Sequence, residues 1–180
     1  MRRCFVLAAA GLAALALPAP SMAESIMEGH AHGCPAGTAA ALPPELASWA
    51  DRQPLKAAGA AGKADAAALE IGKAVDAALL PTPDVKYAIR PEKPGGSVSF
   101  GGLFAFTVAE AGTFRVALGS GAWIDLVKDG VVIDSVAHGH GPECSDVRKM
   151  VDFPLAPGRY ILQIAANGQA QLPLLVTRLP

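Results

Sequence analysis

From Gly96 to the C-terminus, short apolar stretches alternate with turn-forming residue pairs at close and regular spacing. The clearest turn is Asp129-Gly130, because an Asp-Gly pair between two apolar stretches is typical of a tight β-hairpin. Pro157-Gly158 and Asn167-Gly168 indicate two further turns. The pattern predicts strands at 97–108, 113–118, 123–127, 131–136, 150–155, around 160–164 and at 171–177. Short strands joined by frequent turns favour an all-β fold, an antiparallel β-sandwich or jelly roll.

Two features inside these strands refine the prediction. Phe114, Val116 and Leu118 alternate with polar or small residues, so we expect one face of their strand to pack in the core. Gly101-Gly102 interrupts the first strand, which suits a β-bulge or a sharp bend.

Residues 24–62 are rich in Ala, Gly and Pro, and we expect most of them to be loosely ordered. One short helix is predicted at 42–49, because prolines begin it and Leu46 and Trp49 share one face. The Ala-rich residues 63–69 are ambiguous, whereas alternation of apolar with polar or small residues favours a strand at about 69–80. The sequence thus predicts a sandwich domain over 63–180.

Residues 1–23 have the layout of a secretory signal peptide. Arg2 and Arg3 precede a short apolar stretch, and small residues at 21 and 23 suit cleavage before Glu24. The arginine pair leaves both the general and the twin-arginine export routes open. After cleavage we expect no membrane span, because no later apolar run is long enough to cross a bilayer. The sequence therefore predicts a periplasmic or secreted protein.

The charges of the chain are nearly balanced, with 15 Lys and Arg residues against 16 Asp and Glu residues. No basic patch or long run of like charge marks a surface for nucleic acid. We therefore expect no nucleic acid among the partners, which leaves a metal ion, a small ligand or a periplasmic protein.

All four histidines, and both cysteines that follow the signal, fall in two similar segments, HAHGC at 30–34 and HGHGPEC at 138–144. In an oxidising compartment an even pair of cysteines is expected to form a disulfide, here Cys34–Cys144. That bond would bring two His-x-His pairs together, and imidazole nitrogens are good ligands for Cu and Zn. Our first hypothesis is an exported sandwich that binds Cu or Zn through His138, His140, His30, His32 and Glu143.

Other interpretations stay open. The histidines are incidental if 138–144 is a solvated loop stapled by a structural disulfide. Reduced cysteines would instead offer thiolate ligands to Cu(I) or Zn. A different class of function is a non-catalytic module that binds carbohydrate or protein, with Trp123 stacking on a sugar ring.

The stretches FAFTV at 104–108, GTFRV at 112–116, IDLV at 124–127 and LAPGRYIL at 155–162 follow sandwich spacing. In them the chain resembles the bacterial pre-peptidase C-terminal domain, a jelly-roll-like accessory module of secreted proteins. A closer likeness rests on RPEKPGGS at 90–97, GSGAWID at 119–125, HGHG at 138–141 and RKMVDFP at 148–154. Through these segments the chain resembles a group of small exported bacterial proteins often labelled homogentisate 1,2-dioxygenase.

That label implies an oxidoreductase that uses Fe(II). A non-haem iron dioxygenase holds its iron with two histidines and one carboxylate. His138, His140 and Glu143 supply these residue types, so the resemblance implies an iron site there. The sequence leaves open whether the chain is an enzyme, and it assigns no catalytic residue.

Overall fold

The computed structural model describes Cys34 and residues 41–180 of the chain. All of these residues belong to one compact unit of the chain, which begins at Cys34. The predictions for a signal peptide at 1–23 and for ligands at His30 and His32 lie outside the described residues.

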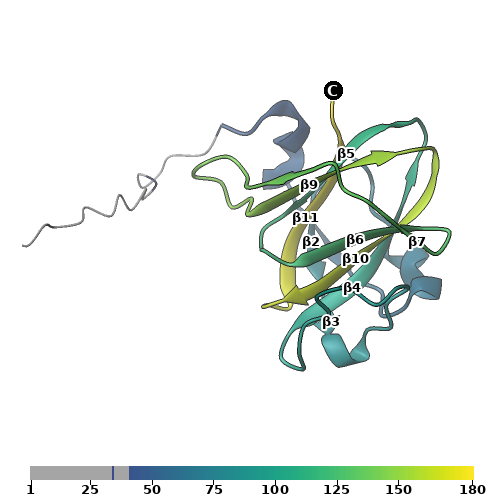
Figure 1. The fold of residues 1–180 in the computed structure, drawn as a ribbon. Helices are drawn as coiled ribbons and strands as arrows, with labels where there is room; N and C mark the ends of the chain where they lie inside the picture. Colours follow the sequence, from purple (N-terminus) through teal and green to yellow (C-terminus); the bar gives the residue numbers. More distant parts are fainter. Residues whose placement is uncertain (1–33, 35–40) are drawn as a thin grey trace, which may run out of the picture. The chain divides into compact units, whose positions relative to one another are not determined.

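Two β-sheets pack face to face in the described part of the chain (Figure 1). The six-stranded sheet has the order β1-β2-β11-β5-β9-β8, and the five-stranded sheet has the order β3-β4-β10-β6-β7. Every ladder is antiparallel except the parallel pair of β1 and β2. The strands are β1 (Gln53–Lys56), β2 (Val75–Ala78), β3 (Leu80–Pro81), β4 (Phe100–Val108), β5 (Gly112–Leu118), β6 (Trp123–Lys128), β7 (Val131–Ile133), β8 (Ala137–Gly139), β9 (Lys149–Leu155), β10 (Gly158–Asn167) and β11 (Gln171–Arg178).

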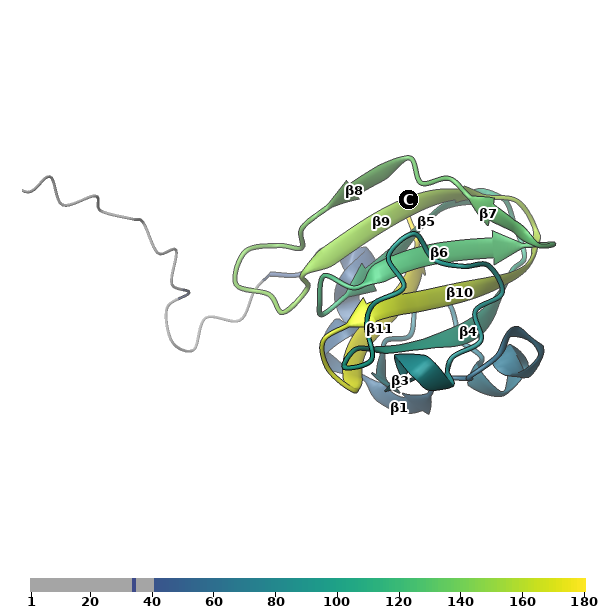
Figure 2. The ribbon, with the colours of Figure 1, turned by 60° about the horizontal axis from the view of Figure 1, so that its bottom comes forward.

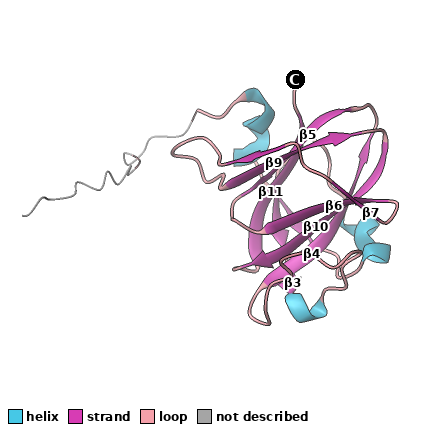
Figure 3. Ribbon diagram, in the orientation of Figure 1, coloured by secondary structure: helices cyan, strands magenta, loops and turns pink. Residues whose placement is uncertain are grey.

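The helical content of the described residues is limited to three short 3-10 helices outside the sheets (Figure 3). They are η1 (Pro44–Ala50), η2 (Ala61–Ala67) and η3 (Thr82–Asp84). None of the helices in the described residues is long and apolar enough to cross a membrane. The predicted all-β sandwich is thus confirmed, whereas jelly-roll connectivity stays a prediction.

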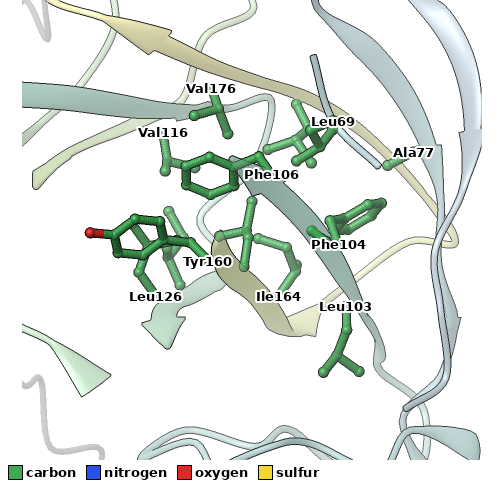
Figure 4. Close-up of a cluster of buried hydrophobic side chains, with 14 of the residues drawn as sticks. Leu69, Ala77, Leu103, Phe104, Phe106, Val116, Leu126, Tyr160, Ile164 and Val176 are labelled. Carbon is green, nitrogen blue, oxygen red and sulfur yellow. The ribbon is translucent and has the colours of Figure 1, made fainter. Parts of the chain in front are cut away.

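The main core lies between the two sheets and is built from alternate residues of facing strands (Figure 4). Phe104 and Phe106 of β4 lie beside Tyr160 and Ile164 of the neighbouring β10, and all four are buried. The Phe106 and Tyr160 rings stack with their centroids 5.6 Å apart. Successive strand residues point to opposite faces, so the apolar alternation read from the sequence becomes the buried face. Phe114, Val116 and Leu118 of β5 confirm this prediction on the other sheet.

The predicted hairpin at Asp129-Gly130 is confirmed. Lys128 of β6 pairs with Val131 of β7, which leaves two residues in the turn. Asp129 and Gly130 have φ of 50° and 77°. Positive φ at both positions is what a type I′ turn requires, and Asp-Gly adopts it readily.

Glycine is needed at position 101 for a reason other than the predicted bulge in its own strand. The irregularity lies opposite, in β10, where the register shifts between Ile164 and Asn167. A Cβ on Gly101 would stand 2.7 Å from the carbonyl oxygen of Ile164 and would also collide with the hydroxyl of Tyr87. Glycine is therefore needed because the bulged partner strand and a tyrosine come close to its backbone.

The sandwich begins on the N-terminal side of residue 63, which corrects the expected boundary. The short helix predicted at 42–49 is η1, whose Leu46 and Trp49 are buried against the six-stranded sheet. Strand β1 follows it and extends the same sheet. This strand escaped prediction because it has four residues, includes a proline and pairs in parallel with a distant segment.

The strand expected at about 69–80 is shorter than predicted. Only Val75–Ala78 and Leu80–Pro81 form strands there, and they belong to different sheets. The ambiguous Ala-rich residues form the 3-10 helix η2, whose buried Ala64 and Ala67 pack into the main core. Small alanine side chains let this helix approach the sheet closely, which periodicity alone does not reveal.

Candidate functional site: a groove beside Trp123

A groove of about 750 Å³ lies at an open edge of the sandwich, where β6 and β7 of one sheet face β8 and β9 of the other (Figure 2). The connector that carries Arg90 and Lys93 adds a further wall. Ile124, Val151 and Phe153 contribute apolar side chains. The polar residues around it come from five separate parts of the chain: Arg90, Glu92, Lys93, Asp125, Asp134, Ser135, His138 and Lys149.

Trp123, the first residue of β6, is half-buried in this groove. Its indole Nε1 donates a hydrogen bond of 2.9 Å to Oδ1 of Asp125. Residues i and i+2 of a strand point to the same side, so β6 itself brings the ring and the carboxylate together. The ammonium groups of Lys93 and Lys149 lie 5.3 and 5.7 Å from the ring centroid, within the range of cation–π attraction.

Two of the charged groups beside the ring, Asp125 and Lys149, have shifted pKa values. Burial raises the pKa of Asp125, and Glu92 adds to this, against the opposing hydrogen bonds and the charge of Lys149. Burial lowers the pKa of Lys149, and the neighbouring Lys93 lowers it further, against Asp125. Both shifts mean that the site disfavours the charged form of these two side chains, and shifted pKa values of this kind cluster at functional sites.

Gln163 fixes the connector that forms one wall of the groove. It is fully buried, and its Oε1 accepts hydrogen bonds from the backbone N–H groups of Ala88 (2.6 Å) and Ile89 (3.2 Å). Its Nε2 donates to the carbonyl oxygen of Ile89 at 3.1 Å. Gln163 also pairs with Asp125 across β10 and β6. Sequence reasoning missed this role, although one glutamine within the otherwise apolar stretch 160–166 was a usable signal.

The structure places His138 and His140 in different surroundings. His138 lies in β8, paired with Val151, and lines the groove together with Trp123. His140 is exposed, and its Nδ1 lies 3.1 Å from the carbonyl oxygen of Arg148. The sequence had not predicted strand β8. Its three exposed residues lack the apolar alternation that marked the other strands.

The predicted disulfide between Cys34 and Cys144 is present, with 5.3 Å between the two Cα atoms. Cys144 lies beside Trp49 and Asp146, in a depression separate from the Trp123 groove. Close packing requires glycine at position 141 of this loop, since a Cβ there would lie 2.5 Å from the carbonyl oxygen of Val147. The bond joins positions 110 residues apart.

His138, His140 and Glu143 do not form a three-ligand site. Among the residues that the structure describes, no group of three His, Cys, Asp or Glu side chains lies close enough to hold a metal ion. The facial set that a non-haem iron dioxygenase needs is therefore not assembled from these three residues. Whether His30 and His32 add ligands lies outside the described residues.

No protein-family model and no curated protein matches this chain. The resemblance to exported proteins labelled homogentisate 1,2-dioxygenase therefore stays an expectation. The four segments that carry it nevertheless share one place in the structure. Each of 90–97, 119–125, 138–141 and 148–154 contributes at least one side chain to the Trp123 groove.

Proposed function

We propose that this chain is an exported, non-catalytic binding module whose groove beside Trp123 takes a small polar ligand of the carbohydrate type. The observation that carries the proposal is the meeting of an indole ring, carboxylates, a hydroxyl and apolar side chains in one groove. Its volume of about 750 Å³ is within the range of small-molecule sites.

A sugar matches this lining because it has both apolar C–H faces and hydroxyl groups. Its hydroxyls would donate to Asp125 and Asp134 and accept from Lys149, while its C–H groups would contact the indole of Trp123. Because Lys93 and Lys149 lie over the ring, the ligand would meet the indole together with two ammonium groups rather than a bare ring.

Export belongs to the same proposal. The layout of residues 1–23 supports it, and so does the disulfide, since such bonds persist in oxidising compartments. The mass of the chain purified from the periplasm or medium tests this part. A chain that begins at Glu24 is expected, and a chain that retains Met1 and stays in the cytoplasm would contradict it.

A glycan array tests the binding function. The wild-type chain is expected to bind a subset of printed glycans equally well with and without EDTA, and Trp123→Ala is expected to weaken that binding at least tenfold. Lys128→Met is the control, because this lysine lies over the ring of Tyr160 and not over that of Trp123. Absence of glycan binding, or equal binding by Trp123→Ala, overturns the proposal.

A second candidate, metal binding, is favoured by the disulfide. That bond ties Cys34 to the loop that follows His138 and His140, and the sequence places His30 and His32 just before Cys34. Cu or Zn would be the ion that imidazole ligands favour. Elemental analysis should then give about one equivalent of metal, lost in the double variant His138→Ala/His140→Ala with strand content intact. Unchanged stoichiometry in that variant rules this candidate out.

A further inference from the structure

Two lysines, Lys93 and Lys149, bring their ammonium groups to the same side chain, the indole of Trp123. They come from the connector before β4 and from the start of β9, and both approach the ring of Trp123. Among the described residues neither has a carboxylate within salt-bridge distance, which is also true of the other described lysines. The salt bridges there are made by four arginines, Arg52, Arg115, Arg159 and Arg178. Arg90, a third cation on the groove, makes no salt bridge to the described residues either.

The hydrogen bonds of Lys149 leave it able to bind a further acceptor. Its Nζ donates to the carbonyl oxygen of Ala122 at 2.8 Å, which uses one of the three N–H bonds of an ammonium group. Burial and the repulsion from Lys93 both oppose its charge. An anion placed between the two ammonium groups would offset this repulsion with two attractions and with short, charge-assisted hydrogen bonds.

We infer that the ligand of this groove carries an anionic group, a carboxylate or a sulfate, that is held between the ammonium groups of Lys93 and Lys149 against the indole of Trp123. This inference rests on the proposed function, because it names the chemistry of the ligand of the same groove. It identifies the ligand class as acidic carbohydrate rather than neutral carbohydrate.

The carboxylates of the groove fit the rest of such a ligand. Asp125 already accepts the Trp123 N–H, and its remaining lone pairs, like those of Asp134, suit hydroxyl donors. Ser135 adds a hydroxyl beside Asp134. A uronic acid or a sulfated sugar has both halves of this pattern, one anionic group and several hydroxyls on one ring.

The experiment compares glycans that differ only in charge. On an array that holds neutral, uronic and sulfated oligosaccharides, the wild-type chain is expected to bind acidic glycans only. Isothermal titration with a tetragalacturonate and its fully methyl-esterified form, or with the sulfated and desulfated forms of a sulfated hit, gives the affinities. The acidic form should bind at least tenfold more tightly, and NaCl should weaken its binding.

Variants assign the effect to the lysine pair. Lys93→Met and Lys149→Met are each expected to weaken binding of the acidic form at least tenfold and to weaken binding of the neutral form much less, so that most of the preference for the acidic form is lost. Lys128→Met is a matched control: its Nζ lies 5.2 Å from the centroid of Tyr160 and donates to a backbone carbonyl at 2.8 Å, as Lys149 does. It should bind like the wild-type chain.

Each failure has its own signature. Equal binding of acidic and neutral glycans, or full affinity in both lysine variants, overturns the anionic site and leaves the carbohydrate module standing. Binding to neutral glycans alone likewise overturns the anionic site and leaves the carbohydrate module standing. No hit of any kind on the array overturns the module and the anionic site together.

Discussion

The two tryptophans of the chain have the same kinds of neighbours and opposite settings. Each indole N–H donates to a carboxylate, Asp146 for Trp49 and Asp125 for Trp123, and each ring has a cation over it. Trp49 is only 2% exposed, whereas Trp123 is half-buried in an open groove. The pattern of aromatic ring, carboxylate and cation therefore does not by itself distinguish a core from a binding site.

The partners of the cations make the difference. Arg52, which lies over Trp49, pairs with Asp76 at 3.0 Å and with Asp146 at 3.2 Å. Lys93 and Lys149, which lie over Trp123, have no carboxylate within salt-bridge distance in the described residues. Breaking the pairs around Trp49 would leave charges without a partner and destabilise the fold, whereas the lysines beside Trp123 can take up a ligand without breaking an ion pair.

The largest effect that follows is on the stability of the fold. Trp49→Ala should lower the free energy of unfolding by about 3–5 kcal/mol, because it removes a buried aromatic side chain from the small apolar cluster that Trp49 forms with Leu46 and Leu175. Trp123→Ala should cost roughly half as much or less, since its ring is only partly buried. Urea denaturation of both variants measures this. Equal losses would remove the distinction between the two sites.

The disulfide lies close to Trp49 rather than to Trp123, because Cys144 borders the depression beside the Trp49 ring. Replacing both Cys34 and Cys144 by Ser is expected to lower the free energy of unfolding by about 2–4 kcal/mol, since the bond restricts the unfolded chain over a long loop. Ligand binding in the Trp123 groove should persist in the folded variant. Lost binding with retained stability would contradict the separation of the two regions.

The ion pair of Arg115 is expected to have a smaller effect. Its guanidinium donates two hydrogen bonds of 2.8 Å to Asp152 and also reaches Glu45 of η1 at 3.4 Å, which joins the helix to the six-stranded sheet. Asp152→Asn should cost about 2 kcal/mol, less than a fully buried pair because water reaches its edge. Asp65→Asn, which breaks the exposed pair with Arg159, is the control and should cost about 0.5 kcal/mol or less. Equal costs measured by urea denaturation would contradict the role given to burial.

Local pattern explains why the strands from β4 to β11 could largely be predicted. Alternation and turn pairs depend on neighbouring residues, as in Phe114 to Leu118 and at Asp129-Gly130. Strands β1 and β8 could not be found in this way, because they are short edge strands whose pairing with β2 and β9 is a long-range event.

The candidate site was predictable only in pieces. Trp123 and His138 were each singled out from the sequence, in separate hypotheses, and the structure places both on one groove. Lys93 and Lys149 are 56 positions apart in the sequence and meet because Gln163 holds the connector against the sheet. Convergence of this kind depends on the whole fold, and neither periodicity nor spacing contains it.

The smallest expected effect is a difference in stability between variants that neutralise the two carboxylates accepting the indole N–H groups. Burial raises the pKa of Asp125 above its ordinary value of 3.8, so its charged form is disfavoured in the folded protein. Asp125→Asn should therefore raise the free energy of unfolding at pH 7, by about 0.5 kcal/mol or less. As pH falls through the raised pKa towards 3.8, the wild-type carboxylate takes up a proton, and the advantage of the variant should disappear.

Asp146→Asn provides the matched contrast, because Asp146 pairs with Arg52 as well as with Trp49. Removing its charge breaks that ion pair, so the variant should be less stable than the wild-type chain at pH 7, the opposite sign from Asp125→Asn. Urea denaturation of both variants at pH 7, 5, 4 and 3 gives the two signs and their pH dependence. If both substitutions stabilise or both destabilise at pH 7, the charges around Trp123 are balanced in the same way as those around Trp49, and the groove loses the electrostatic feature that marks it as a binding site.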